Sequence, residues 1–203
     1  MRNLLVAIFL FVICNALWAK KNFMPSSFTA EFEEVRLTSL RKKIKKSYGD
    51  IYYKYPGQIR FEVKRPHRLV FVRNMKKTWI YRASLHPEEP GQLTETSNSK
   101  KRGGQRMRIV AFLDLLKGDL AKSKQFKMKK SKGVRILHFN KSSQKELGLT
   151  KATLEFKEKF NFKNLNSLEI LKSDGKKIHF NFFNIQVNKK FIDSTFIYKR
   201  KKK

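Results

Sequence analysis

The sequence predicts a mainly β protein in which a single strongly curved antiparallel sheet forms an open barrel. Two observations lead to this fold class. Apolar and polar residues alternate with a period of two along most of the 203 residues, and one segment alone has helical spacing. The composition, with 18 Phe but only 9 Gly and 5 Pro, argues against a disordered or low-complexity chain. Because a curved sheet needs its concave face filled, the helix is the expected plug.

The first strands show the alternation most clearly. From Ser27 to Val35, apolar residues alternate with polar ones, as in a half-buried strand. The alternation returns from Gly49 to Tyr55 and from Ile59 to Val63, on either side of the turn residues Pro56-Gly57. These two segments therefore predict a hairpin with one apolar face.

Further strands follow the hairpin, and turns separate them. Lys132-Gly133 and Asp174-Gly175 are turn sequences between neighbours that would pair antiparallel. The expected strands cover residues 68–72, 78–82, 92–96, 124–128, 134–139, 152–157, 165–171, 177–184 and 192–198.

One segment does not show the alternation of the strands and instead predicts an amphipathic helix between Gln105 and Leu120. Its apolar residues recur three or four positions apart, so they form one stripe along a helix. The stripe consists of Ile109, Phe112, Leu113, Leu116 and Leu120, widened by Met107, Val110 and Leu115.

Residues 1–19 are expected to be a secretory signal peptide that is removed after Ala19, with Ala16 as the alternative. A charged start precedes an apolar run that is too short to span a bilayer, which needs about 20 apolar residues. An uncleaved membrane anchor is the alternative. The single Cys14 would be removed with this segment, which excludes disulfides, Cys-ligated metals and Cys nucleophiles. Residues 20–203 are expected to form one exported domain.

No catalytic residue, metal site or cofactor is predicted, so an enzyme is not expected. The four histidines, His67, His86, His138 and His179, are widely spaced and have no paired-ligand spacing. Nucleophile elbows, phosphate loops and dinucleotide fingerprints are absent from the sequence.

A large basic surplus is the other strong signal. The chain carries 47 Lys and Arg against 16 Asp and Glu, a formal net charge of +31. Such a surface attracts anionic phospholipid, lipopolysaccharide phosphates or nucleic acid, although simple solubilisation is an alternative. Export argues against nucleic acid as the partner. The candidate membrane-docking residues form the tail Lys199, Arg200, Lys201, Lys202 and Lys203.

Five segments, taken in order along the chain, resemble the bacterial outer-membrane lipoprotein carrier family, LolA. Residues 26–32 and 49–62 are similar to its opening hairpins, and residues 76–81 to a short turn before an aromatic-rich strand. The helix over 112–120 falls where the family places a lid helix, and residues 178–196 resemble its closing strands. The resemblance covers nearly the whole mature chain.

The resemblance implies a half-open barrel, lined with apolar side chains and covered by a lid helix. Family members take acylated lipoproteins from an inner-membrane ABC-type release complex, shield the acyl chains in the periplasm and deliver them to an outer-membrane acceptor. The expected protein is therefore a periplasmic, monomeric carrier that also meets anionic membrane surfaces. Since burying an acyl chain is worth about 0.8 kcal/mol per CH₂, such a carrier needs a large apolar cavity.

Candidate site residues follow from this implied role, and for each of them the alternative is an ordinary place in the core. The candidate lipid-binding residues, which share one apolar face, are Phe32, Ile51, Tyr53, Tyr55, Ile59, Phe61 and Val63. The candidate lid-helix residues are Ile109, Phe112, Leu113 and Leu116.

The sequence departs from the family pattern in two places. Only residues 20–25 precede Ser26 in the mature chain, which is too short for the helix that family members usually have there. The family commonly places an Arg before the Pro of the second strand, where it ties the lid shut, whereas Tyr55 stands there in this chain. We therefore expect lid control by the single helix and aromatic contacts. The alternative function is a periplasmic sensor or envelope-binding module that recognises lipidated proteins or anionic glycolipid without transport.

Overall fold

A computed structural model describes residues 22–37, 43–86, 88–98 and 105–199. The predicted signal peptide, Cys14 and the tail residues 200–203 lie outside these ranges. The described strands of the first half are β1 (Ser27–Leu37), β2 (Ile44–Lys54), β3 (Gln58–Arg65), β4 (Leu69–Arg73), β5 (Lys77–Arg82) and β6 (Gln92–Ser97). Those of the second half are β7 (Phe126–Ser131), β8 (Val134–Phe139), β9 (Leu149–Phe156), β10 (Leu165–Lys172) and β11 (Lys177–Val187).

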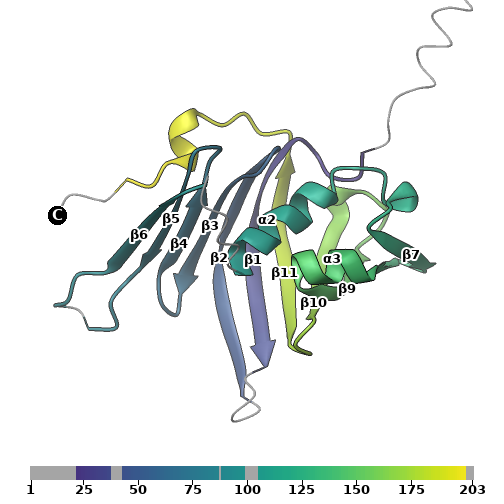
Figure 1. The fold of residues 1–203 in the computed structure, drawn as a ribbon, viewed down its shortest axis with the longest axis horizontal. Helices are drawn as coiled ribbons and strands as arrows, with labels where there is room; N and C mark the ends of the chain where they lie inside the picture. The colour runs from purple at the N-terminus through teal and green to yellow at the C-terminus, as the bar shows by residue number, and fades with distance from the viewer. Residues whose placement is uncertain (1–21, 38–42, 87, 99–104, 200–203) are drawn as a thin grey trace, which may run out of the picture.

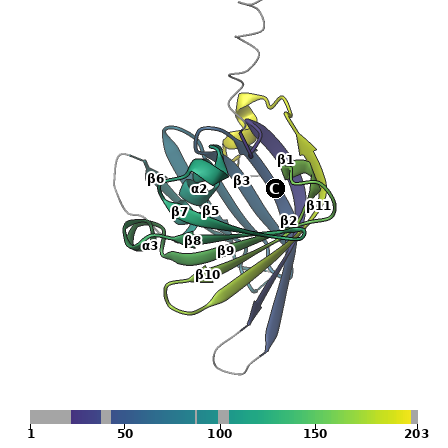
Figure 2. The ribbon, with the colours of Figure 1, turned by 90° about the vertical axis from the view of Figure 1, so that its right-hand side faces the viewer.

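These strands form one antiparallel sheet in the order β6-β5-β4-β3-β2-β1-β11-β10-β9-β8-β7. Each half of the chain is a meander, and the pairing of β1 with β11, with Phe32 opposite Phe182, joins the two halves. The sheet is curved and unclosed because β6 and β7 are its two edges and do not pair with each other (Figures 1 and 2). The predicted mainly β class, with a single curved antiparallel sheet, is confirmed.

Between these two edges the chain crosses the concave side of the sheet. The crossing contains helix α2 (Gln105–Leu115) and the short 3₁₀ turn η1 (Leu120–Lys122). Figure 2 shows α2 lying across the opening of the curved sheet. The helix therefore lies where the sequence predicts a plug, although the expected helix over 105–120 ends as an α-helix at Leu115.

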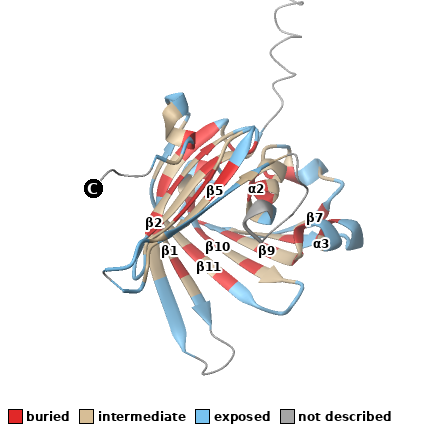
Figure 3. Cartoon of the chain, turned by 60° about the vertical axis from the view of Figure 1, so that its left-hand side comes forward, coloured by how far each residue is buried: buried red, intermediate tan, exposed pale blue. Residues whose placement is uncertain are grey.

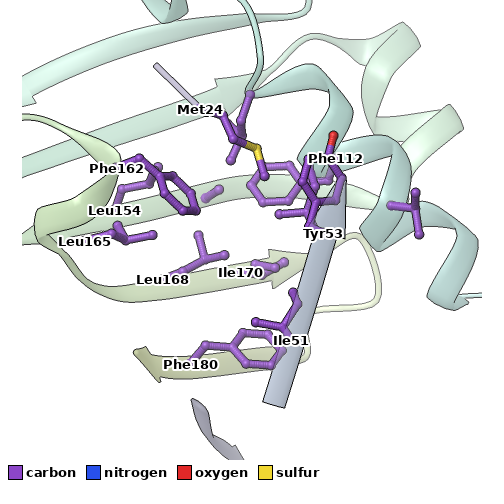
Figure 4. Close-up of a cluster of buried hydrophobic side chains, with 14 of the residues drawn as sticks. Met24, Ile51, Tyr53, Phe112, Leu154, Phe162, Leu165, Leu168, Ile170 and Phe180 are labelled. Carbon is purple, nitrogen blue, oxygen red and sulfur yellow. The ribbon is translucent and has the colours of Figure 1, made fainter. Parts of the chain in front are cut away.

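Alternation along the strands separates the two faces of the sheet. On β2, Ile51 and Tyr53 are buried on the concave side, whereas Tyr52 between them is only partly buried on the outer side. Figure 3 shows buried and less buried residues following one another along the strands. The concave face continues onto β9, β10 and β11, where its side chains join the same cluster as α2 (Figure 4).

The strand predicted over 192–198 is wrong. The chain forms the 3₁₀ helix η3 (Asp193–Phe196) there, which contacts β3. The physical reason is that the outer face of β4 and β5 is also apolar, with Val70 and Trp79 buried, and needs a cover. Tyr198 supplies part of it by stacking on Tyr81, with ring centroids 5.5 Å apart. The C-terminal segment therefore packs against the outer side of the sheet instead of extending it.

A second helix, α3 (Lys141–Leu147), is absent from the sequence prediction. The Asn140 side chain caps its start by accepting a hydrogen bond from Ser143 N–H, and Gly148 ends it in the left-handed conformation, with φ of 66°. The helix has seven residues, of which only Ser143 and Leu147 are buried. Two buried positions are too few to produce a helical pattern of apolar residues in the sequence. The capping residues Asn140 and Gly148 were therefore the only sequence signal for this helix. No helix among the described residues has the length and apolar character needed to cross a bilayer.

Candidate functional site

Most of the predicted lining residues lie on the floor formed by β1, β2 and β3 on the concave side of the sheet. Phe61 is partly buried and stacks on Phe32, with ring centroids 4.4 Å apart. Tyr55 differs from the rest because it follows the end of β2 and is 44% exposed. The buried members of the predicted set are Phe32, Ile51, Tyr53, Ile59 and Val63.

The predicted lid residues of α2 and the turn after it face this floor. Phe112, Leu113 and Leu116 are buried, and Ile109 is partly buried against the same cluster. Phe112 meets Phe139 of β8 edge to face at 6.1 Å, and Figure 4 shows it beside Tyr53 and Met24. A ligand that enters the centre of the concave face must therefore displace side chains of α2.

One carboxylate of α2 joins the helix to the β2–β3 hairpin. The Tyr53 hydroxyl donates a hydrogen bond to Asp114 Oδ1 at 2.5 Å, and Gly57 N–H donates to the same oxygen at 3.0 Å. Arg73 Nη1 donates to the Gly57 carbonyl at 2.9 Å, which fixes the turn that presents this N–H. Burial, with the hydrogen bond to Asp114, raises the pKa of Tyr53, so the phenol stays a neutral donor. We call Tyr53, Gly57 and Asp114 the latch.

The end of the helix is also attached to the segment that precedes β1. Lys117 Nζ donates to the Met24 carbonyl at 3.1 Å and to Ser26 Oγ at 2.9 Å. Its Nζ also lies 5.9 Å from the ring centroid of Tyr55, so this tyrosine lies beside the segment that follows α2. Desolvation lowers the pKa of Lys117. Backbone hydrogen bonds of 3.3 Å from Phe23 and Met24 to Gly118 and Leu116 complete the attachment.

Sequence reasoning did not identify Asp114 or Lys117. A single acidic or basic residue beside an apolar helical stripe is usually a solvated one, and only the fold brings these two residues to the hairpin and to the N-terminal segment. The chain has only 16 acidic residues. An Asp within the predicted helix was therefore the one available signal that Asp114 has a specific contact.

Part of the apolar floor extends beyond the helix. Leu69 on β4 and Ile80 on β5 share the concave face with Phe61, since Phe61 is opposite Phe71 and Phe71 is opposite Ile80. These side chains are partly buried against the core cluster and remain partly exposed. Figure 1 shows α2 in front of β1 and β11, with β3 to β6 to one side of it. The strip formed by Phe61, Leu69 and Ile80 is therefore an accessible apolar part of the concave face.

The described residues do not contain a group of three or more His, Cys, Asp or Glu side chains that could hold a metal ion. The features of this site are instead an apolar floor, a helix that covers it and a few polar contacts that fasten the helix.

A curved, unclosed sheet with an apolar concave face and a helix across it is the architecture that the resemblance to lipoprotein carriers implies. The family model for the outer membrane lipoprotein carrier protein LolA matches residues 24–199, and the chain belongs to this family. No curated protein matches the chain.

Three solved structures that are similar to this chain are distant from it in sequence. A LolA superfamily protein from Nitrosomonas europaea is 10% identical, with 87% of this chain and 92% of that chain covered and a TM-score of 0.45. A DUF1329 family protein from Desulfovibrio piger is 9% identical, with 91% and 93% covered and a TM-score of 0.38. A domain from Vibrio parahaemolyticus, described as an outer membrane lipoprotein-sorting protein, is 11% identical, with 93% and 95% covered and a TM-score of 0.39.

Proposed function

We propose that this protein is a periplasmic carrier that shields the acyl chains of lipoproteins on its concave face and transfers them from the inner to the outer membrane. The observation that carries the proposal is an apolar floor covered by a helix that polar contacts fasten near its C-terminal end. Membership of the lipoprotein carrier family supports it. The mature chain from residue 20 would act as one carrier domain without catalysis.

The energetics of loading fit an exchange between helix and cargo. Removing three large apolar side chains, Phe112, Leu113 and Leu116, from the floor costs about 5–9 kcal/mol, at about 1.5–3 kcal/mol each. One 16-carbon acyl chain gains about 12 kcal/mol when it is buried, at about 0.8 kcal/mol per CH₂. Cargo can therefore displace the helix, and the returning helix offsets much of the cost of release. Loading is a population shift between two occupants of one apolar surface.

The proposed partners follow from this cycle. An inner-membrane ABC-type release complex would load the carrier, and an outer-membrane acceptor would receive the cargo. The basic tail 199–203 would hold the carrier near anionic membranes, since each Lys or Arg near such a surface contributes about 1 kcal/mol. Lys199 is exposed, and the other tail residues lie outside the described part of the chain. Deleting residues 199–203 should weaken binding to anionic liposomes while leaving lipopeptide affinity unchanged.

A matched pair of substitutions on one edge of the sheet tests the cargo site. Ile80 points to the concave side on β5, and Leu93 on the neighbouring strand β6 lies on the outer side, opposite Tyr81. Ile80→Ser should weaken binding of a fluorescent triacylated lipopeptide about tenfold, since it removes apolar contact area from the accessible strip. Leu93→Ser should leave binding unchanged, and circular dichroism confirms that both variants fold.

Two outcomes would contradict the carrier proposal. Equal lipopeptide affinity in wild type, I80S and L93S would mean that the concave face is not the cargo site. Tight lipopeptide binding without transfer to acceptor liposomes that carry the outer-membrane partner would favour the sensor or envelope-binding function instead.

A direct test of the carrier proposal is native mass spectrometry of the protein purified from its own periplasm. The spectrum should show the protein bound to an acylated lipoprotein.

A further inference from the structure

A small apolar pocket lies near the β7 edge of the sheet, beside the short turn η1. Its volume is about 210 Å³. Pockets that enclose a whole small molecule usually measure about 300–1,000 Å³, so this pocket suits one apolar part of a larger ligand. Its walls are Phe23, Leu120, Ala121, Met128 and Phe160, with the polar side chains Asp119, Lys130 and Arg135.

An exposed aromatic side chain stands at this pocket in a fixed position. Phe160 is 39% exposed, yet it stacks on Phe23 at 5.1 Å and meets Phe156 edge to face at 5.1 Å. The Arg135 guanidinium lies 4.6 Å from its ring centroid. Arg135 is held in turn by hydrogen bonds from Nη1 to two backbone carbonyls, at 3.0 and 2.8 Å. Because these contacts order Phe160 in advance, burying its exposed edge costs little conformational entropy.

Six lysines lie on the three segments that line this pocket, and we call them the basic rim. Gly133 accepts a backbone hydrogen bond of 2.9 Å from Phe156, so the β7–β8 turn lies beside the start of the β9–β10 loop. Lining residues from η1, β7 and the β9–β10 loop bring all three segments to the same pocket. The rim consists of Lys122 on η1, Lys130 and Lys132 at the β7–β8 turn, and Lys157, Lys159 and Lys163 in the β9–β10 loop.

The basic rim carries charge that the protein itself does not neutralise. All six lysines are exposed, and within the described ranges none of them forms an ion pair with an acidic side chain. The β10–β11 turn is different: Lys172 and Lys176 pair with Asp174 at 3.0 and 3.1 Å, and Lys177 lies 3.9 Å from Glu169. Unpaired cations around an apolar pocket complement a partner that is anionic at its surface and apolar beneath.

We propose that the basic rim and Phe160 dock the protein on an anionic phospholipid bilayer, with an apolar part of one lipid entering the pocket. The lysines meet the phosphate layer, and the Phe160 edge meets the acyl boundary below it. Nucleic acid fits less well, because single-stranded bases bind by stacking on a free aromatic face and Phe160 already stacks on Phe23. This surface lies at the β7 end of the sheet, whereas the accessible strip of Phe61, Leu69 and Ile80 lies on β3 to β5, so docking does not require cargo.

Two double variants of equal charge test the docking surface. Lys132→Gln with Lys159→Gln removes two rim charges, and Lys176→Gln with Lys177→Gln removes two paired charges at the β10–β11 turn. Binding of the cargo-free protein to phosphatidylcholine vesicles with and without phosphatidylglycerol is measured by co-sedimentation. The rim variant should bind anionic vesicles more than tenfold more weakly, because each lysine at an anionic surface accounts for about fivefold. The turn variant should lose less than twofold, and added salt should weaken wild-type binding.

A fluorescence measurement checks the apolar part of the surface. The emission of the Phe160→Trp variant should shift to shorter wavelength on anionic vesicles and be quenched by lipids brominated near the headgroup. Equal losses in the two double variants, equal binding to neutral vesicles or an unshifted emission of the Phe160→Trp variant would overturn the proposal. Unchanged vesicle binding with weakened binding of single-stranded DNA would also overturn it, in favour of nucleic acid. Lipopeptide affinity should stay the same in both double variants, so failure of docking is distinguishable from failure of the carrier function.

Discussion

The Tyr53 hydroxyl donates a 2.5 Å hydrogen bond to the Asp114 carboxylate and so connects the floor of the concave face to the helix that covers it. The same carboxylate oxygen accepts the Gly57 N–H at 3.0 Å. One acidic side chain of α2 therefore satisfies a donor from strand β2 and a donor from the turn that follows it. The helix can leave the floor only when both donors find another acceptor.

Asp114→Ala should release the helix without changing its apolar face. The substitution leaves the Tyr53 hydroxyl and the Gly57 N–H without their acceptor, and each unsatisfied buried group costs about 1–3 kcal/mol. We expect the free energy of unfolding in urea to fall by about 2–3 kcal/mol. The amides of α2 should exchange with deuterium faster than those of β2, because the loss acts on the helix attachment. Lipopeptide binding should be faster, since opening limits access.

Tyr53→Phe provides a graded version of the same test, and Tyr52→Phe provides its control. Tyr53→Phe removes one of the two donors and should cost about 1–1.5 kcal/mol. Tyr52 lies on the outer face, and its hydroxyl has only a 3.4 Å contact with Asp50. If Tyr52→Phe accelerated exchange in α2 as much as Tyr53→Phe did, the latch would have no special part in holding the helix.

A reversible cross-link can hold the helix closed. Met24 N–H donates to the Leu116 carbonyl at 3.3 Å, which brings the two backbones within the reach of a disulfide. In the chain from residue 20, which contains no Cys, the double variant M24C/L116C should load lipopeptide about tenfold more slowly when oxidised. Reduction should restore loading. Identical loading rates in both redox states would mean that this end of the helix stays in place when cargo binds.

The alternation of the strands was the most informative part of the sequence, because a sheet with one buried face imposes a period of two directly. Eight of the nine later strands and both strands of the first hairpin follow from it, whereas the helix at Phe112 follows from its own spacing of three or four residues. The failure at 192–198 has a specific cause. Phe196 and Tyr198 look like alternate residues of a strand, but they pack on the outer face of β3 to β5, and alternation does not show what covers an element.

The candidate site could be predicted only in part, for a related physical reason. Ile51, Tyr53 and Ile59 lie on one face because alternation determines faces. Asp114 reaches Tyr53 only because the chain crosses from one edge of the sheet to the other, and no local pattern encodes that crossing. Tyr55 shares the alternation phase but lies beyond the strand end, so it is exposed at the rim.

Gly49 is a position where the sheet has no room for a side chain. A Cβ there would lie 1.9 Å from the Glu62 carbonyl oxygen and 2.9 Å from the Phe32 ring. The pairing of β2 with β3 shifts register at this residue. We expect Gly49→Ala to lower the free energy of unfolding by about 3 kcal/mol or more, because backbone must move to admit the methyl group. Gly118→Ala is the control, since a Cβ there meets nothing within 4 Å, and its effect should stay within about 0.5 kcal/mol.

Glu33 gives the protein a pH dependence that can be assigned to one side chain. Its carboxylate accepts hydrogen bonds of 2.9 Å from Lys46, Tyr48 and Asn181, which hold its pKa near 2, below the ordinary 4.5. Since the folded pKa is the lower one, this stabilisation is present above pH 4.5 and is lost as the pH falls toward 2. Glu33→Gln should therefore reduce stability in urea by about 1 kcal/mol at pH 7, and the difference from wild type should vanish at low pH. Lys46→Gln removes the largest cause of the low pKa, so it should move the loss of stability to higher pH. A difference between wild type and E33Q that did not change with pH would exclude the ionised carboxylate as its origin.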